Sequence, residues 1–216
     1  MRIARLPGVF PPHSDTWLLA AALQRQPQLR AGAVLDVCTG SGALAITAAL
    51  GGARFVTAVD VSARAVLAVR INARLNGVGI EAIRGSLLDA VPGRRFDVIV
   101  SNPPYLPAER EALPGRGRAR HTEAGTTGRA LLDRLIAAAP AHLAPRGVLL
   151  VTHSSMNGEA ATLARLRAAG LEPSVVERRR GGLGPLLAAR APRLEEQGLL
   201  APGERTEELL VVAGAA

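Results

Sequence analysis

The sequence contains no lysine, a single cysteine and few aromatic residues, and these shortages exclude several classes of protein. All 26 basic residues of the 216-residue chain are arginines, against 18 acidic residues, and the formal net charge is +8. Cys38 has no second cysteine for an internal disulfide, and four scattered histidines without neighbouring cysteines give no zinc-ligand spacing. A disulfide scaffold and a metal site are therefore excluded, while the positive charge favours contact with phosphates or an acidic partner.

Long hydrophobic runs are also missing. No window approaches the roughly 18 consecutive apolar residues that a membrane span needs, and Pro7, Pro11 and Pro12 interrupt the start of the chain before any apolar run forms. We therefore expect no signal peptide, no membrane contact and a cytoplasmic protein. With 48% hydrophobic residues, a chain of this length can bury a substantial core, so we expect residues 1–216 to form one domain.

Strand-like and helix-like segments alternate along the chain from about residue 33. The expected strands are residues 33–37, 55–61, 80–84, 96–101, 148–153, 171–176 and 208–212. The expected helices are residues 43–50, residues 63–76 after an N-cap at Ser62, residues 130–143, and a leading helix over residues 16–23 within a helical segment 1–32. Strands that are apolar on both faces and joined by crossover helices predict an α/β fold whose parallel sheet is covered on both sides.

Two segments depart from this alternation. Residues 107–128 follow the carboxyl end of a strand, are punctuated by proline and glycine, and carry Arg110, Arg116, Arg118, Arg120 and His121. Because open α/β sheets bind ligands at that edge, we expect a mobile basic loop on the substrate side of the site, the alternative being a surface excursion without function. Residues 178–203, rich in arginine, glycine and proline, are expected to be a solvated connection before the last strand or a partner contact.

A glycine-rich turn, residues 38–42, follows the first strand and precedes a helix. Glycines allow the backbone to approach a ligand closely, and the helix N-terminus offers unpaired N–H groups. Asp60 stands twenty residues beyond Gly40 at the end of the second strand, where a carboxylate accepts hydrogen bonds from a ribose. These features predict a nucleotide-like cofactor and leave both a dehydrogenase and a methyltransferase open. Asp36, just before the turn, favours a cofactor with a cationic amino-acid tail.

The fourth strand ends in the run Asn102-Pro103-Pro104-Tyr105. Attack of a planar NH2 group on a methyl sulfonium requires its lone pair to turn out of the plane. The side-chain carbonyl of Asn102 and the backbone carbonyl of Pro103 can each accept one N–H, and the prolines fix where these acceptors point. The Tyr105 ring can cover the substrate plane and make a cation–π contact with the developing charge. We predict these four residues as catalytic, without a general base; an ordinary turn after a strand is the alternative.

The motifs VLDVCTGSGALA, VTAVDVS and IVSNPPY, in this order and spacing, resemble those of class I S-adenosylmethionine-dependent methyltransferases. The resemblance is to the HemK-type enzymes that methylate the glutamine amide of class 1 release factors. It implies a Rossmann-like fold with a seven-stranded, mostly parallel sheet, helices on both faces and an antiparallel last strand. Residues 9–12 and 15–19 are similar to the leading segment of the short eukaryotic and archaeal branch, and the helical N-terminal domain of the bacterial branch has no room before residue 34.

The resemblance also implies S-adenosyl-L-methionine as cofactor. The implied cofactor-binding residues are Thr16, Asp36, Cys38, Thr39, Gly40, Gly42, Asp60, Ser86, Leu87 and Asn102. Three positions depart from the family: Cys38 replaces a usual glycine, Ser86 an aspartate that accepts from the adenine amine, and Thr127 a common acidic residue. A neutral hydroxyl is a weaker acceptor than a carboxylate, so we expect weaker cofactor binding rather than its loss. Cys38 is expected to be a buried small hydrophobe and not a reactive thiol.

Four functions follow from these observations. The first is methyl transfer to a planar amide nitrogen, with the glutamine of a release factor or another protein as the expected acceptor and substrate partner. The second keeps the cofactor and transfers to the exocyclic amine of adenine or cytosine in RNA or DNA. An NADP-type oxidoreductase and a cofactor-binding module without catalysis are the others, and Asn102 to Tyr105 argue against both. The short eukaryotic branch works with a small partner protein, which makes such an activating partner a further expectation.

Overall fold

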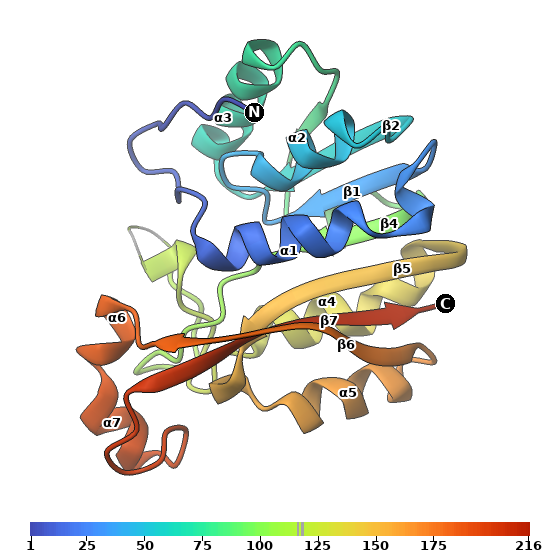
Figure 1. Cartoon of the computed structure of the whole chain (residues 1–216). Helices are drawn as coiled ribbons and strands as arrows, with labels where there is room; N and C mark the ends of the chain where they lie inside the picture. The colour runs from blue at the N-terminus through green and yellow to red at the C-terminus, as the bar shows by residue number, and fades with distance from the viewer. Residues whose placement is uncertain (116, 118) are drawn as a thin grey trace.

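The computed structural model describes residues 1–115, 117 and 119–216, and a seven-stranded sheet runs through its centre (Figure 1). The strands are β1 (Ala33–Val37), β2 (Phe55–Asp60), β3 (Glu81–Arg84), β4 (Phe96–Ser101), β5 (Leu143–Ser154), β6 (Glu172–Gly182) and β7 (Thr206–Ala215). Their order in the sheet is β3-β2-β1-β4-β5-β7-β6. Neighbours from β3 to β5 are parallel, whereas β7 is antiparallel to both β5 and β6. The predicted α/β class, seven strands and antiparallel last strand are confirmed.

Helices cover both faces of the sheet. They are α1 (Ser14–Gln24), α2 (Ala43–Leu50), α3 (Ala63–Leu75), α4 (Ala130–His142), α5 (Glu159–Ala168), α6 (Pro185–Ala188) and α7 (Ala191–Glu196). In Figure 1, α1 and α2 lie in front of the strands and α4 lies behind them. The β6–β7 pair extends past the rest of the sheet on the left and carries α6 and α7 at its end (Figure 1).

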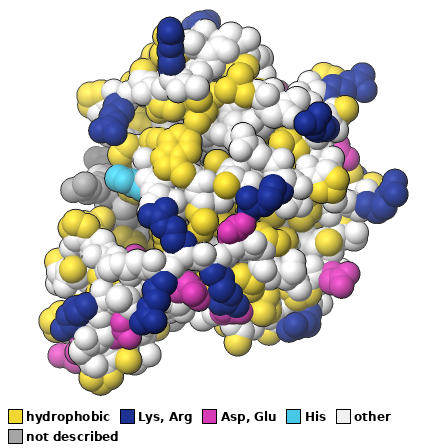
Figure 2. Space-filling model, in the orientation of Figure 1, with side chains coloured by type: hydrophobic (Ala, Val, Ile, Leu, Met, Phe, Trp, Pro, Cys, Tyr) yellow, Lys and Arg dark blue, Asp and Glu magenta, His cyan; other side chains and the backbone are white. Residues whose placement is uncertain are grey.

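Arginines are spread over the molecular surface. Figure 2 shows them across the whole of the face seen in Figure 1, with acidic side chains beside several of those in its lower half. Arg178 of β6, for example, contacts the carboxylates of both Glu159 and Glu208. Such exposed pairs contribute little to the stability of the fold, and their main effect is to reduce the local positive charge around the arginine.

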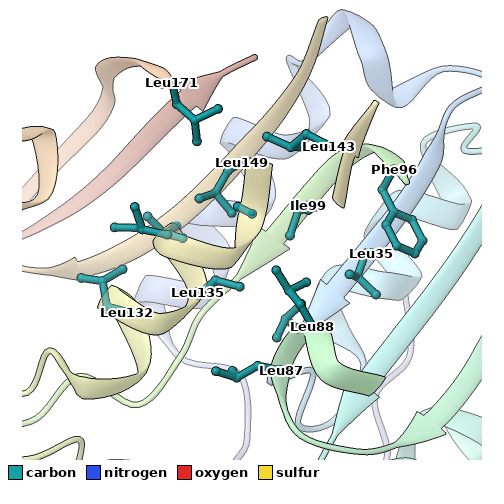
Figure 3. Packing of buried hydrophobic residues seen from close by; sticks show 14 of the residues in the cluster. Leu35, Leu87, Leu88, Phe96, Ile99, Leu132, Leu135, Leu143, Leu149 and Leu171 are labelled. Atoms are coloured by element: carbon teal, nitrogen blue, oxygen red, sulfur yellow. The ribbon is translucent and has the colours of Figure 1, made fainter. Parts of the chain in front are cut away.

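The two faces of the central strands are both apolar, because successive residues point to opposite sides of a strand. Leu149 of β5 packs with Leu132 and Leu135 of α4, as Figure 3 shows. Its neighbour Leu150 belongs to the cluster on the opposite face, together with residues of α1 and α2 such as Leu19. The two layers of helices hold the strands in place, and with them the carboxyl-end turns that form the site.

The expectation that residues 178–203 form a solvated connection before the last strand is wrong for residues 178–182. They are the last residues of β6 and pair with β7 as far as Gly182 opposite Thr206, and α6 and α7 follow them. The run of arginines hides the strand pattern, but an edge strand tolerates charged side chains because one of its sides has no strand neighbour. The other predicted elements overlap the observed ones, although β5 starts at Leu143, directly after α4.

Candidate active site

A cleft of about 840 Å³ lies at the carboxyl ends of β1, β2 and β4. Its walls come from the N-terminal segment, the turn after β1, the ends of β2 and β3, the residues after β4 and the loop 107–128. Eight of the predicted cofactor-binding residues line it: Thr16, Cys38, Thr39, Gly40, Asp60, Ser86, Leu87 and Asn102.

The two remaining predicted residues, Asp36 and Gly42, lie behind the cleft wall. The Asp36 carboxylate accepts hydrogen bonds from the hydroxyl of Thr39 at 2.5 Å and from the N–H of Ala45 at 3.0 Å. It is fully buried and ties the glycine turn to the start of α2. A Cβ on Gly42, whose φ is +84°, would lie 3.1 Å from Cγ2 of Val69, so this glycine lets α2 and α3 pack closely.

Burial makes the Asp36 carboxyl a weaker acid than an exposed aspartate. Loss of hydration raises the pKa of its carboxyl to about 7, although the bonds from Thr39 and Ala45 act in the opposite direction. Its second oxygen, Oδ1, is buried and makes no hydrogen bond with any described residue. With a pKa of about 7 the carboxyl is only partly ionised at neutral pH, and a cationic group bound in the neighbouring cleft would favour its charged form.

Cys38 has a φ of +59°, a left-handed conformation that costs most residues about 1–2 kcal/mol and that glycine adopts freely. This explains physically why glycine is usual at this position. Burial and the nearby carboxylates of Asp60 and Asp36 raise the pKa of the Cys38 thiol far above its usual range. The thiol therefore stays protonated, as expected for a small hydrophobe and not for a nucleophile.

Asp60 joins the end of β2 to the glycine turn. Its Oδ2 accepts the N–H of Gly40 at 3.0 Å, and its Oδ1 accepts the N–H of Ser62 at 2.9 Å. Each carboxylate oxygen has capacity for a further hydrogen bond. Ser86 and Leu87 line the same cleft from the turn after β3, and Leu87 also has a left-handed φ of +46°.

A second hollow of about 390 Å³ adjoins the cleft. All four residues of the motif after β4 line it, and Asn102 and Pro104 line the cleft as well. The Nδ2 of Asn102 donates to the hydroxyl of Thr16 at 3.1 Å. The two spaces share Phe10, Asn102, Pro104 and His121 in their linings, so they adjoin at the motif after β4.

Tyr105 forms the far wall of the second hollow. Its hydroxyl donates to Oδ2 of Asp15 at 2.9 Å, and its backbone carbonyl accepts from Nδ2 of Asn157 at 2.8 Å. Burial, with the negative charge of Asp15, holds the pKa of Tyr105 well above its usual range, so the phenol stays protonated. One contact therefore holds the hydroxyl end of the side chain, and the other holds the backbone from which the ring extends.

The described part of the loop 107–128 is attached to the rest of the chain at several points. The N–H of Leu106 donates to the carbonyl of Thr122 at 2.7 Å. Arg190, in the α6–α7 region, donates to the carbonyl of Pro107 at 2.9 Å and pairs with the carboxylate of Glu123. Arg120 and His121 line the cleft. Arg110 is exposed, and Arg116 and Arg118 lie outside the described residues.

The methyltransferase small domain family matches residues 1–113, just over half of the chain. A Methanocaldococcus jannaschii protein named as a protein N5-glutamine methyltransferase is 32% identical over 188 residues, which are 87% of this chain and 93% of that protein. The chain belongs to this methyltransferase family. The predicted S-adenosylmethionine-dependent N-methyltransferase, with its class I methyltransferase fold, is thereby confirmed.

Two further relatives bear on the HemK-type resemblance. The release factor glutamine methyltransferase of Bordetella pertussis is 38% identical over 176 residues, which cover 78% of this chain and 64% of that protein. The solved E. cuniculi Mtq2-Trm112 complex, responsible for methylation of the eRF1 translation termination factor, matches 96% of this chain and 98% of its own with a TM-score of 0.63 and 25% identity. Both are consistent with the resemblance read from the motifs.

Sequence reasoning missed three residues that build the site of the methyltransferase. Asp15 belongs to the segment 15–19 that resembles the short branch and is given no role there, yet it accepts the Tyr105 hydroxyl. Asn157 and Arg190 lie far along the chain from the motif and the loop that they hold. No local pattern marks such residues, because their roles depend on which segments the fold brings together.

The described residues contain no group of three or more His, Cys, Asp or Glu side chains placed to hold a metal ion. None of the helices in this part of the chain is long and apolar enough to cross a membrane.

The high pKa of Asp36 predicts a pH-dependent stability. A carboxyl that holds its proton more tightly when folded favours the fold at low pH, and this contribution is lost as pH rises from about 4 to about 7. We expect the free energy of unfolding of the wild type, measured in urea, to fall relative to that of Asp36→Asn by a few kcal/mol over this range. The exposed Asp89→Asn is the matched control, and parallel pH profiles for wild type and Asp36→Asn would contradict the assignment.

Proposed function

We propose that this methyltransferase transfers a methyl group from S-adenosylmethionine to the side-chain amide nitrogen of a glutamine in a translation release factor. The observation that carries the proposal is the position of Asn102, which lines both the cofactor cleft and the adjoining hollow. Its Nδ2 is bonded to Thr16, which supports the proposal by leaving the acceptor atom Oδ1 for the substrate. The names of the relatives support glutamine as the methylated residue.

The residues of the cleft fit S-adenosylmethionine. Asp60 has acceptor capacity for the ribose hydroxyls, and Ser86 and Leu87, which the resemblance implies beside the adenine, line the same cleft. Thr39 and Gly40 also line it, and an α-ammonium group bound near them would favour the charged form of Asp36, whose Oδ1 has no hydrogen-bond partner among the described residues. When bound, the cofactor supplies an electrophilic methyl group on a positively charged sulfur.

The residues after β4 provide what a neutral amide needs in order to react. Delocalisation into the carbonyl makes an amide nitrogen a poor nucleophile, so the enzyme must hold its lone pair toward the methyl group. The Oδ1 of Asn102 and the carbonyl of Pro103 accept the two N–H bonds of the glutamine, and the prolines prevent these acceptors from moving. Tyr105, held by Asp15, covers the amide plane and stabilises the positive charge that develops on nitrogen. The nitrogen gains the methyl group that the sulfonium loses, S-adenosylhomocysteine is the leaving group, and the nitrogen then gives one of its protons to water.

A labelled-methyl assay tests the acceptor. Tritiated S-adenosylmethionine is supplied with purified release factor, with the same factor carrying alanine for the glutamine of its Gly-Gly-Gln motif, and with total RNA and DNA. We expect label on the intact factor and none on the variant or the nucleic acids. Label in nucleic acid alone would contradict the proposal and assign the acceptor to a base amine. The dependence on a small activating partner stays a prediction. Repeating the assay with added cell extract tests whether such a partner increases the transfer of label.

Replacement of Asp60 tests how the cofactor is held. We expect Asp60→Asn to weaken binding of S-adenosylmethionine by on the order of tenfold or more, because hydrogen bonds to a charged acceptor are the stronger ones. Calorimetric titration gives the affinity, and circular dichroism checks the fold. The matched control is Asp89→Asn, whose side chain is 77% exposed. Wild-type affinity in Asp60→Asn would refute the role in cofactor binding.

Replacement of Asn102 tests the chemistry. We expect Asn102→Ala to lower kcat by on the order of a hundredfold, the usual cost of losing one preorganised hydrogen-bond partner of a transition state. Cofactor affinity should change much less, since other residues make the remaining contacts with the cleft. Single-turnover rates at saturating cofactor separate the two effects, and an unchanged rate would remove Asn102 from the mechanism.

A further inference from the structure

A chain of hydrogen bonds leads from the reacting amide back to Asp15, in the first turn of α1. Asp15 is buried, with 6% of its surface exposed. Its Oδ1 accepts the N–H of Thr16 at 2.7 Å and the hydroxyl of Thr16 at 3.3 Å, and its Oδ2 accepts the hydroxyl of Tyr105 at 2.9 Å. One carboxylate therefore contacts Tyr105 directly and Asn102 through Thr16.

The direction of each bond in this chain follows from the carboxylate. An ionised carboxylate only accepts hydrogen bonds, so the single hydroxyl hydrogen of Thr16 points to Asp15. The Oγ1 of Thr16 is then an acceptor toward its other neighbours, the N–H of His13 at 3.3 Å and Nδ2 of Asn102 at 3.1 Å. The Asn102 amide must present its NH2 end to Thr16, which leaves Oδ1 for the substrate.

The opposite orientation of Asn102 would not be productive. A rotated amide would set Oδ1 against an oxygen whose hydrogen is already used, and would present two N–H donors to a glutamine NH2 group that is itself a donor. The two ends of an asparagine amide are nearly identical in shape, so packing cannot distinguish them. The hydrogen-bond chain supplies the distinction.

We propose that Asp15 is a positioning residue, which fixes the orientation of the Asn102 amide through Thr16 and the rotation of the Tyr105 ring by direct contact. This inference rests on the proposed transfer to a glutamine amide. Asp15 does not line the cofactor cleft, and although it lines the second hollow, both of its carboxylate oxygens are already bonded to Thr16 and Tyr105. A purely structural role in the first turn of α1, where an acidic residue stabilises the helix N-terminus, is the competing explanation.

A double-mutant cycle separates the two explanations. Asp15→Asn keeps the shape but introduces an NH2 group, so the Thr16 hydroxyl is no longer committed and Asn102 can rotate. We expect kcat for the release factor to fall by on the order of tenfold, with little change in KM for S-adenosylmethionine. In the Asn102→Ala background the same change should cost clearly less, because no amide is left to orient and only the contact with Tyr105 is still lost.

Three further variants keep the test decisive if Asp15→Asn is poorly folded. Thr16→Val removes the connecting hydroxyl at constant shape and should reproduce the loss of kcat, whereas Thr16→Ser keeps the hydroxyl and should lose much less kcat than Thr16→Val. Tyr105→Phe breaks only the direct contact and should give a smaller loss that adds to that of Thr16→Val. Melting temperatures of all variants identify any that are merely unstable.

Equal kcat values for wild type and Asp15→Asn would overturn the positioning role, as would an undiminished loss in the Asn102→Ala background. Either result, with an active wild type, leaves the proposed function standing. Absence of label transfer by the wild type both alone and with added cell extract would overturn the proposed function, and the inference would fall with it.

Discussion

The hydrogen bond between Asn102 and Thr16 joins residues 86 positions apart, and the geometry of the site depends on it. Asn102 leaves the carboxyl end of β4 in the middle of the sheet, while Thr16 lies in the first turn of α1 on one face. The bond closes the wall between the cofactor cleft and the second hollow with a side chain that lines both. In the proposed mechanism, any change that moves α1 relative to β4 would therefore change the angle at which an acceptor meets the methyl group.

Two buried carboxylates support this arrangement in different ways. Asp36 holds the glycine turn from beneath, and its raised pKa shows that its charged form is costly in the folded protein. Asp15 receives three hydrogen bonds from Thr16 and Tyr105 and shares its charge among them. A cationic cofactor would offset part of the cost at Asp36, which links binding to stability in the same region of the molecule.

Much of the site could be predicted because its residues follow strand ends. In a parallel sheet, the carboxyl ends of β1, β2 and β4 meet at one edge, so Gly40, Asp60 and Asn102 could be placed together from sequence order alone. Sequence could not distinguish residues that face the cleft from those that support it. Asp36 and Gly42 belong to the same motif as Gly40 but serve the turn and the α2–α3 contact.

Residues whose roles depend on tertiary contacts could not be predicted. Arg190 reaches the loop after β4 only because the β6–β7 pair extends beyond the sheet and returns α6 and α7 toward it. The same extension was obscured in the sequence by three consecutive arginines, which resemble a solvated connection and not an edge strand. The periodicity of apolar residues predicts the fold class. It does not predict the end of β6, which is a strand because it pairs with β7.

The most direct measurement is a crystal structure of the enzyme with S-adenosylhomocysteine and a release-factor peptide that contains the Gly-Gly-Gln motif. The account predicts the glutamine side chain in the second hollow, with its nitrogen donating to Oδ1 of Asn102 and to the carbonyl of Pro103, about 3–3.5 Å from where the methyl carbon would lie. Nδ2 of Asn102 should remain on Thr16. A peptide bound elsewhere, or an Asn102 side chain that donates to the glutamine, would contradict the account.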